Sequence, residues 1–230
     1  MEEIILTDIP FEPDRGQLMD KMRIKPGSHY VDELNALVDQ AGRIAKPKGL
    51  YKVVPIDHKG DDTVVINGIT FKSRILRVNL EQANRVFAFV ATGGTELEQW
   101  VQSIDDILYN FWADAIAEQA LRSAITALLA HMTDRYRPGH LSAMHPGSLG
   151  DWPIREQKAL FDLLDNPREA IGVELLDSLL MTPTKSVSGI YFPTEESFES
   201  CQLCPIENCP NRRAPYDESL YERKYCPAVN

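Results

Sequence analysis

The apolar run Val86–Ala91 places the strongest constraint on the fold, because every position in it is apolar. A strand with one face in water alternates apolar and polar residues, whereas a continuous apolar run is expected when both faces are covered. The run ends at Gly93-Gly94. A long helical pattern follows and continues to about Met132, with a predicted break near Ser103. We therefore predict a buried central strand that leads directly into long helices.

The spacing of apolar residues, together with turn and capping residues, predicts further strands and helices around this strand. Asn67-Gly68 between two β-branched segments is the strongest short hairpin signal in the chain. Thr95 with Glu98 three residues later is typical of a capping box at the start of the long helical pattern. Ser28 can cap the expected helix Val31–Ile44. The expected strands are Ile4–Ile9, Leu50–Ile56, Thr63–Ile66, Ile69–Phe71, Ile75–Val78 and Ser186–Phe192, and the expected helices include Pro13–Met22, Val31–Ile44 and Ile154–Leu164.

Helices and hairpins alternate without the βαβ rhythm of a parallel sheet. We therefore predict an α+β fold with a mainly antiparallel, twisted sheet flanked by long helices. The segment 133–151 is rich in Gly, Pro and His and is expected to be a loop, and regular pattern fades after Pro193. The predicted organisation is an α+β body over residues 1–192 and an irregular, Cys-rich tail over residues 193–230.

Charge and hydropathy exclude several classes of function. The formal net charge of −10 and the pI of about 5.0 argue against sequence-independent nucleic-acid binding, which needs an excess of Lys and Arg. No segment approaches the roughly 20 apolar residues that cross a bilayer, so no membrane association is expected. The acidic N-terminus lacks the features of a signal peptide, so we expect a cytoplasmic protein, in which thiols stay reduced.

The cysteines form the clearest candidate site. All four lie in the tail with the spacing C-x2-C-x4-C-x16-C, and three of them precede proline. Four thiolates from one short segment are typical of a metal centre, whereas free cysteines usually scatter through a core. The Cys-Pro steps favour an iron–sulfur cluster, and a structural zinc ion is the alternative. The predicted metal ligands are Cys201, Cys204, Cys209 and Cys226.

Three stretches resemble the activation domain of cobalamin-dependent methionine synthase. The most specific is Ser186–Phe192, which is similar to the family's Ser-Val-Ser-Gly-x-Tyr-Phe strand. The second is the turn Pro146-Gly147-Ser148 followed by the helix Arg155–Leu164. The third and weaker likeness is Phe89–Gly94 with the long helix that carries Glu118. Together they span about residues 86–192.

This resemblance implies an α+β activation domain that binds S-adenosylmethionine and docks onto a corrinoid-binding protein or methyltransferase, where cobalamin that has slipped to Co(II) is methylated reductively. It also implies a role for Glu118, which falls where the family places a carboxylate near the cationic groups of the methyl donor. The ligand-binding residues that it implies are Glu118, Pro146, Gly147, Ser148, Ser186, Ser188, Gly189 and Tyr191.

Two positions depart from the family. Ala143 stands where the family has an arginine, the natural partner of the methionine carboxylate, and Ser148 stands where it has a tyrosine. His131, His140 and His145 lie in or near the loop and could supply an imidazole to cobalt or to proton transfer, although loop histidines are more often solvated polar residues.

Three functions remain open from the sequence. The first is an accessory redox or activation protein for a corrinoid methyltransferase system. The second is a corrinoid-docking module with structural zinc. The third is an S-adenosylmethionine-binding enzyme of the activation type.

Overall fold

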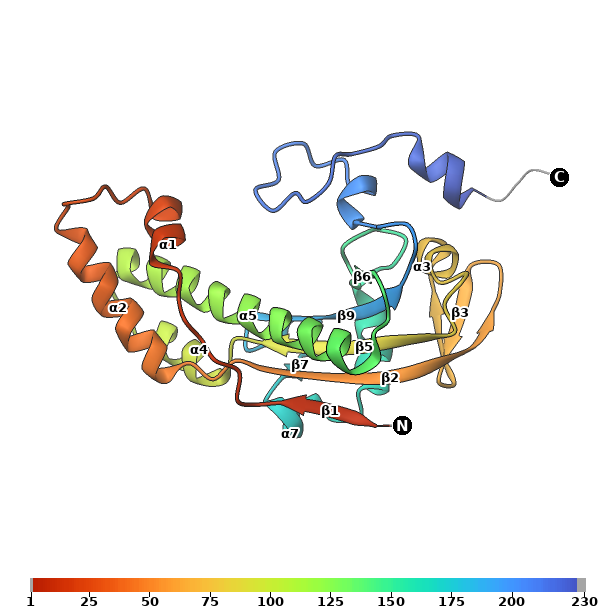
Figure 1. Cartoon of the computed structure of the whole chain (residues 1–230), viewed down its shortest axis with the longest axis horizontal. Coiled ribbons are helices and arrows are strands. Elements are labelled where there is room, and N and C mark those ends of the chain that lie inside the picture. The colour runs from red at the N-terminus through yellow and green to blue at the C-terminus, as the bar shows by residue number, and fades with distance from the viewer. Residues whose placement is uncertain (1, 227–230) are drawn as a thin grey trace.

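A sheet of seven strands runs through the molecule in the computed structural model, which describes residues 2–226 (Figure 1). Every strand pair is antiparallel, and the order along the sheet is β4-β3-β2-β5-β9-β6, with β1 paired to β2. The strands are β1 (Glu3–Leu6), β2 (Lys48–Lys59), β3 (Thr63–Ile66), β4 (Ile69–Lys72), β5 (Arg85–Thr92), β6 (Leu141–Met144) and β9 (Ser186–Pro193). A separate two-stranded sheet contains β7 (Glu174–Leu175) and β8 (Met181–Thr182).

Strand β5 is the predicted central strand, and all of its residues from Val86 to Thr92 are buried. Its side chains alternate between two hydrophobic clusters. Val86 and Val90 pack in the cluster on one face, and Phe87 and Phe89 pack in the cluster on the other. The prediction that both faces of this strand are covered is confirmed.

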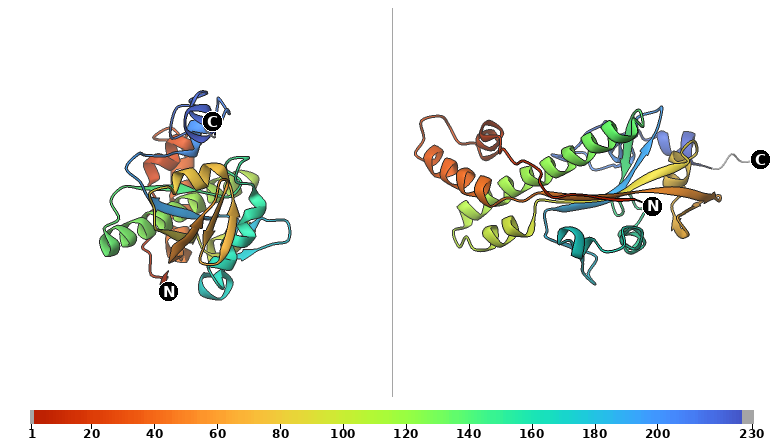
Figure 2. Two further views of the ribbon diagram at one scale, coloured as in Figure 1. Left: turned by 90° about the vertical axis from the view of Figure 1, so that its right-hand side faces the viewer. Right: turned by 60° about the horizontal axis from the view of Figure 1, so that its bottom comes forward.

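Helices lie on both faces of the sheet (Figures 1 and 2). Helix α5 (Ile107–Tyr136) runs along one face, where Ala124, Leu128 and Met132 pack against Phe87 and Phe89. The opposite face is covered by α6 (Gln157–Leu163), which follows the 3-10 helix η1 (Ile154–Glu156), by α7 (Pro167–Ile171) and by α3 (Arg74–Asn79). The first half of α5 extends beyond the sheet and forms a third cluster with α1 (Arg15–Met22), α2 (Tyr30–Ile44) and α4 (Thr95–Gln102).

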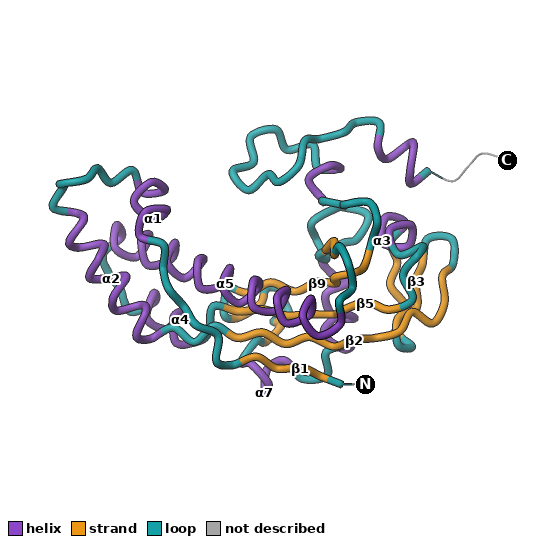
Figure 3. Tube along the Cα trace, in the orientation of Figure 1, coloured by secondary structure: helices purple, strands orange, loops and turns teal. Residues whose placement is uncertain are grey.

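As far as Cys226, the tail lies along one side of the body, and its helical segments are short (Figures 1 and 3). These segments are η2 (Ser200–Leu203) and η3 (Tyr221–Tyr225). Two aromatic residues of the tail, Phe198 and Tyr225, are buried in the main hydrophobic cluster of the body. The irregular structure expected for this segment is therefore present, but the segment is anchored at both ends.

Four local expectations were wrong. Residues 75–78 were expected to extend the hairpin as a strand, but they form helix α3 because the Ser73 side chain caps it by accepting a hydrogen bond from Leu76 N. The expected loop 133–151 contains strand β6 at the sheet edge. Gly94, and not Thr95, is the N-cap of α4.

The fourth expectation concerned Ser28. Helix α2 begins after His29, which makes no side-chain cap, although Ser28 Oγ lies 3.4 Å from Tyr30 N. The Asn67-Gly68 hairpin is confirmed, with both residues at positive φ. Between residues 2 and 226 no helix is both long enough and apolar enough to span a bilayer.

Candidate functional site

Two of the three stretches that carry the resemblance, Ser186–Phe192 and the turn Pro146-Gly147-Ser148, lie close together at the β6 edge of the sheet. Strand β6 pairs with β9, and this register places Ala143 opposite Tyr191. The Tyr191 ring stacks on Phe89 with centroids 4.4 Å apart. Burial raises the pKa of the Tyr191 phenol to about 12, so this hydroxyl is a neutral hydrogen-bonding group at physiological pH.

His145 is the tightest contact between β9 and the segment that follows β6. Its Nδ1 lies 2.9 Å from Ser188 O, and its ring meets Phe89 edge to face at 5.8 Å between centroids. A Cβ added to Gly189 would lie 2.6 Å from His145 Nδ1. Glycine at position 189 is therefore required by the close approach of the imidazole. The enclosed ring has a pKa below its usual range, because burial disfavours the charged form.

The Pro146-Gly147-Ser148 turn directly follows His145. Gly147 has φ +85°, and a Cβ there would lie 2.9 Å from Ile154 Cδ1, so both conformation and space favour glycine. Gly147 N donates to Trp152 O at 2.8 Å, and Ser148 N donates to His145 O at 3.1 Å. Gly147 and Ser148 are exposed, so a ligand can reach this turn.

The two serines of β9 have structural partners. Ser186 Oγ donates to Pro183 O at 2.7 Å and lies 2.9 Å from Thr92 Oγ1. Ser188 is buried, and its carbonyl oxygen faces His145. Among the described residues, neither serine hydroxyl makes a hydrogen bond to an imidazole that could activate it, which agrees with a packing or ligand-contact role.

Glu118 lies on α5 between two cations. Its carboxylate contacts Lys21 Nζ at 2.5 Å and Arg122 Nη2 at 2.6 Å. The hydrogen bond from Lys21 is the largest cause of a lowered Glu118 pKa, so the group is ionised at neutral pH. The three charges line a pocket of about 260 Å³ between α1 and α5, together with Gln17 and Gln119. A cationic ligand could contact this carboxylate only if it shared the carboxylate oxygens with Lys21 and Arg122.

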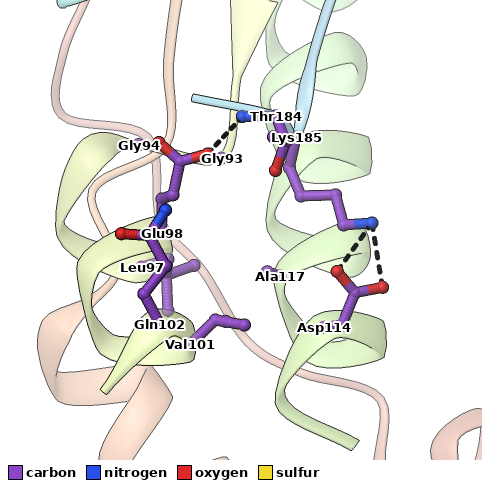
Figure 4. A pocket seen from close by; sticks show the side chains of 10 residues that line it. All are labelled: Gly93, Gly94, Leu97, Glu98, Val101, Gln102, Asp114, Ala117, Thr184 and Lys185. Atoms are coloured by element: carbon purple, nitrogen blue, oxygen red, sulfur yellow. Dashed lines mark hydrogen bonds and ion pairs between the residues drawn. The ribbon is translucent and has the colours of Figure 1, made fainter. Parts of the chain in front are cut away.

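A second, smaller pocket lies beside Gly93 and Gly94 (Figure 4). Its volume of about 60 Å³ is enough for only a few water molecules. The charged groups on its wall are already paired. Lys185 bonds to Asp114 at 2.9 Å, and Glu98 accepts from Thr184 N at 2.5 Å. The Gly-Gly turn therefore serves packing, since Gly93 lies against the backbone of α5.

The two other histidines that the sequence singles out, His131 and His140, have different surroundings. His131 on α5 bonds through Nδ1 to the Tyr51 hydroxyl at 2.8 Å and is held on the sheet face. His140 precedes β6 and is exposed. Of the three histidines that the sequence singles out, only His145 contacts the predicted ligand-binding residues.

The four cysteines are free thiols, with Cys226 exposed and the other three half-buried. Within residues 2–226 no three His, Cys, Asp or Glu side chains lie close enough together to hold a metal ion. Arg212 organises the Cys-containing part of the tail, because its guanidinium donates to the carbonyl oxygens of Cys201 and Cys204, both at 3.0 Å. The predicted four-thiolate centre thus stays a prediction.

The tail also reaches the β6–β9 edge. Phe198 N donates to Ser142 Oγ at 2.9 Å, next to Ala143. Arg213 N lies 3.4 Å from Cys201 Sγ, and its guanidinium contacts Glu199 Oε2 at 3.3 Å. The charges of Arg213 and Glu199 act on Tyr191. No local pattern in the sequence predicts that Arg213 lies near Tyr191, because this proximity depends on the tail folding back.

Comparison with solved structures identifies the fold. The chain has 16% sequence identity to a protein whose solved structure is described as the MetH reactivation domain bound to AdoHcy, with a TM-score of 0.64 over 86% of this chain and 80% of that one. The fold is therefore that of a methionine synthase reactivation domain. Among curated proteins none matches the sequence.

A family comparison locates the likeness in the sequence. Residues 147–203 match the model of "Vitamin B12 dependent methionine synthase, activation domain". The resemblance to this family is thereby confirmed, and so is the predicted α+β, mainly antiparallel fold. The matched segment includes Cys201 but ends before Cys204, Cys209 and Cys226, so three of the four cysteines lie outside it.

Proposed function

We propose that this chain is an activation protein for a cobalamin-dependent methyltransferase and helps return Co(II) cobalamin on a partner protein to its active state. The observation that carries the proposal is the family match over residues 147–203, which includes the end of the Pro-Gly turn and all of β9. The reactivation-domain fold over most of the chain supports it.

The proposed chemistry is reductive methylation. One electron from an external low-potential reductant converts Co(II) to Co(I). Co(I) then takes the methyl group from the sulfonium of S-adenosylmethionine, which gives methyl-Co(III) and the neutral thioether S-adenosylhomocysteine. The relative with this fold is described as bound to AdoHcy, which supports the same ligand class here. The contribution of this chain is to bind the donor and to present it to the cobalt of the partner.

The proposed donor site joins the exposed turn at Gly147 and Ser148, strand β9 and Glu118. An ionised carboxylate attracts the sulfonium and the ammonium group of the donor, and such charge-assisted contacts are stronger than neutral ones. Glu118 is paired with Lys21 and Arg122, so the cationic groups of the donor would have to share this carboxylate with these two side chains.

We also propose that the tail cysteines bind a metal centre, with an iron–sulfur cluster as the first candidate and zinc as the second. The spacing supports this, and so does the closure of the tail loop, since Phe198 and Tyr225 pack together and bring the two ends of the Cys-containing segment to one place. A cluster would let the chain deliver the electron itself, whereas zinc would leave a docking module that needs a separate reductant. Analysis of iron, sulfide and zinc in protein purified without oxygen separates these outcomes.

Equilibrium binding of S-adenosylmethionine tests the ligand part of the proposal. We expect measurable binding to the intact chain. Glu118→Gln should weaken it about tenfold, in line with the loss of one charge-assisted contact of about 1.5 kcal/mol. Glu169→Gln, at an exposed position of helix α7, is the matched control and should bind as the parent does. Absence of binding to the parent chain would refute this part.

A further inference from the structure

We propose that Arg213, carried by the Cys-rich tail, binds the carboxylate of the amino-acid portion of S-adenosylmethionine. The inference rests on the proposed function and adds to it a specificity-determining residue that the body of the domain does not contain. The observation behind it is that the folded tail brings a guanidinium to the β6–β9 edge, where the strand residue Ala143 has no polar side chain.

The tail is fixed at this edge by its first residues. Phe198 is buried, and its backbone N–H donates to the buried Ser142 hydroxyl at 2.9 Å. Ser142 is followed in β6 by Ala143, which pairs with Tyr191. The start of the tail therefore lies directly beside the strand pair that carries Tyr191.

Arg213 is tied to the same place although it lies further along the chain. Its backbone N–H points to Cys201 Sγ at 3.4 Å, and its Nε contacts Glu199 Oε2 at 3.3 Å. Glu199 directly follows Phe198, so both contacts fold the later part of the tail back onto the anchored part.

The charge of Arg213 affects titratable groups at the predicted ligand-binding surface. Among the described residues, Arg213 is the cation that acts on the pKa of both His145 and Tyr191, and Glu199 is the anion that acts on Tyr191. Both groups come from the tail. The Arg213 side chain keeps 63% of its surface exposed, so a ligand at the turn can reach it.

The geometry of a guanidinium suits this role. Only Nε is engaged by Glu199, and no described residue accepts a hydrogen bond from the terminal nitrogens of Arg213. The two terminal nitrogens, which carry four N–H groups, remain for a carboxylate, which a guanidinium binds as a planar fork. The neighbouring Glu199 remains paired and would exclude a second anion, which favours a ligand that carries one carboxylate beside positive groups.

The test compares S-adenosylmethionine with decarboxylated S-adenosylmethionine, which has the same sulfonium and adenosine but no carboxylate. Affinities for both are measured calorimetrically on the full chain and on Arg213→Gln. The matched control is Arg223→Gln, which removes the same charge from the same tail, where Arg223 pairs with Asp217. Thermal unfolding of each variant confirms that it is folded.

The parent chain should prefer the carboxylated ligand by roughly 10- to 100-fold, the usual range for a charge-assisted pair. Arg213→Gln should remove this preference and leave binding of the decarboxylated ligand unchanged, and Arg223→Gln should keep it. The inference is overturned if Arg213→Gln still prefers the carboxylated ligand, or if the preference is lost in Arg122→Gln instead. Neither outcome contradicts the proposed function. Failure of the parent to bind either ligand would refute the donor site itself.

Discussion

Phe198 and Tyr225 pack against each other edge to face, with ring centroids 6.5 Å apart and an interplanar angle of 73°. These two residues lie at opposite ends of the segment that contains three of the four cysteines, and Cys226 follows Tyr225 directly. Both are buried in the main cluster of the body, and the Tyr225 hydroxyl donates to Asn79 Oδ1 at 2.9 Å. Residues 198–225 of the tail thus form a closed loop, which Phe198 and Tyr225 anchor to the body.

This anchoring predicts a graded loss of stability at Tyr225. Tyr225→Phe removes one hydrogen bond and should lower the free energy of unfolding by about 1 kcal/mol. Tyr225→Ala leaves a cavity and should lower it by about 3–5 kcal/mol. Tyr216→Ala, at an exposed tail position, is the control and should change it by less than about 0.5 kcal/mol. Equal effects of Tyr225→Ala and Tyr216→Ala in chemical denaturation would contradict the anchoring.

Gly189 gives a second prediction, because an added methyl group has no space there. The Cβ of Gly189→Ala would lie 2.6 Å from both His145 Nδ1 and Met144 O, so the substitution should destabilise the fold by about 1–3 kcal/mol. Gly42→Ala makes the same chemical change within α2, where nothing lies within 4 Å, and should stabilise by about 0.5–1 kcal/mol. In urea denaturation, the two substitutions should change the free energy of unfolding in opposite directions. If Gly189→Ala leaves the free energy of unfolding unchanged, the close approach of the imidazole is refuted.

His145 should make stability depend on pH. Its folded-state pKa lies below the ordinary value of 6.5, mainly because burial disfavours the charged ring, so the unfolded chain binds more protons in this range. The free energy of unfolding therefore rises with pH through the interval below about 6.5 and loses this contribution as the medium is acidified. His145→Gln should remove this part of the slope. Parallel pH profiles for the parent and the variant would show that the ring is not held neutral.

The cysteine proposal predicts a shared effect of single substitutions. If four thiolates hold one centre, Cys204→Ser and Cys226→Ser should each remove most of the bound metal, because an incomplete set of ligands binds far more weakly. Ser200→Ala should leave the metal content unchanged. Metal analysis after anaerobic purification is the measurement. Full metal content in Cys226→Ser would exclude that residue from the centre.

The sequence predicted the central part of the fold because its signals there are local and strong. Strand β5 is a continuous apolar run, and Asn67-Gly68 adopts the positive φ values that a tight hairpin needs. Helix α3 was mistaken for a strand because Ile75–Val78 is a short apolar run, which periodicity alone cannot assign. The Ser73 cap was a signal that could have identified it. Strand β6 was missed because it is short and lies between turns.

The candidate site was predictable only in part. Gly147, Gly189 and Tyr191 were identified from their motifs, and the structure brings their segments together through the pairing of β6 with β9. The approach of Arg213 to this edge was not predictable, since it depends on tertiary anchors at Phe198 and Tyr225 and not on any local pattern. The division between body and tail at residue 193 stays a prediction.

The most direct test of the proposed function follows the methyl group itself. Cob(II)alamin bound to the cobalamin-binding domain of a methionine synthase is mixed, without oxygen, with methyl-labelled S-adenosylmethionine, a low-potential chemical reductant and the intact chain. We expect methyl-Co(III) to form with one labelled methyl group and one S-adenosylhomocysteine per cobalt, and only when the chain is present. If cobalt stays as Co(II), or is methylated equally without the chain, the activation role is contradicted.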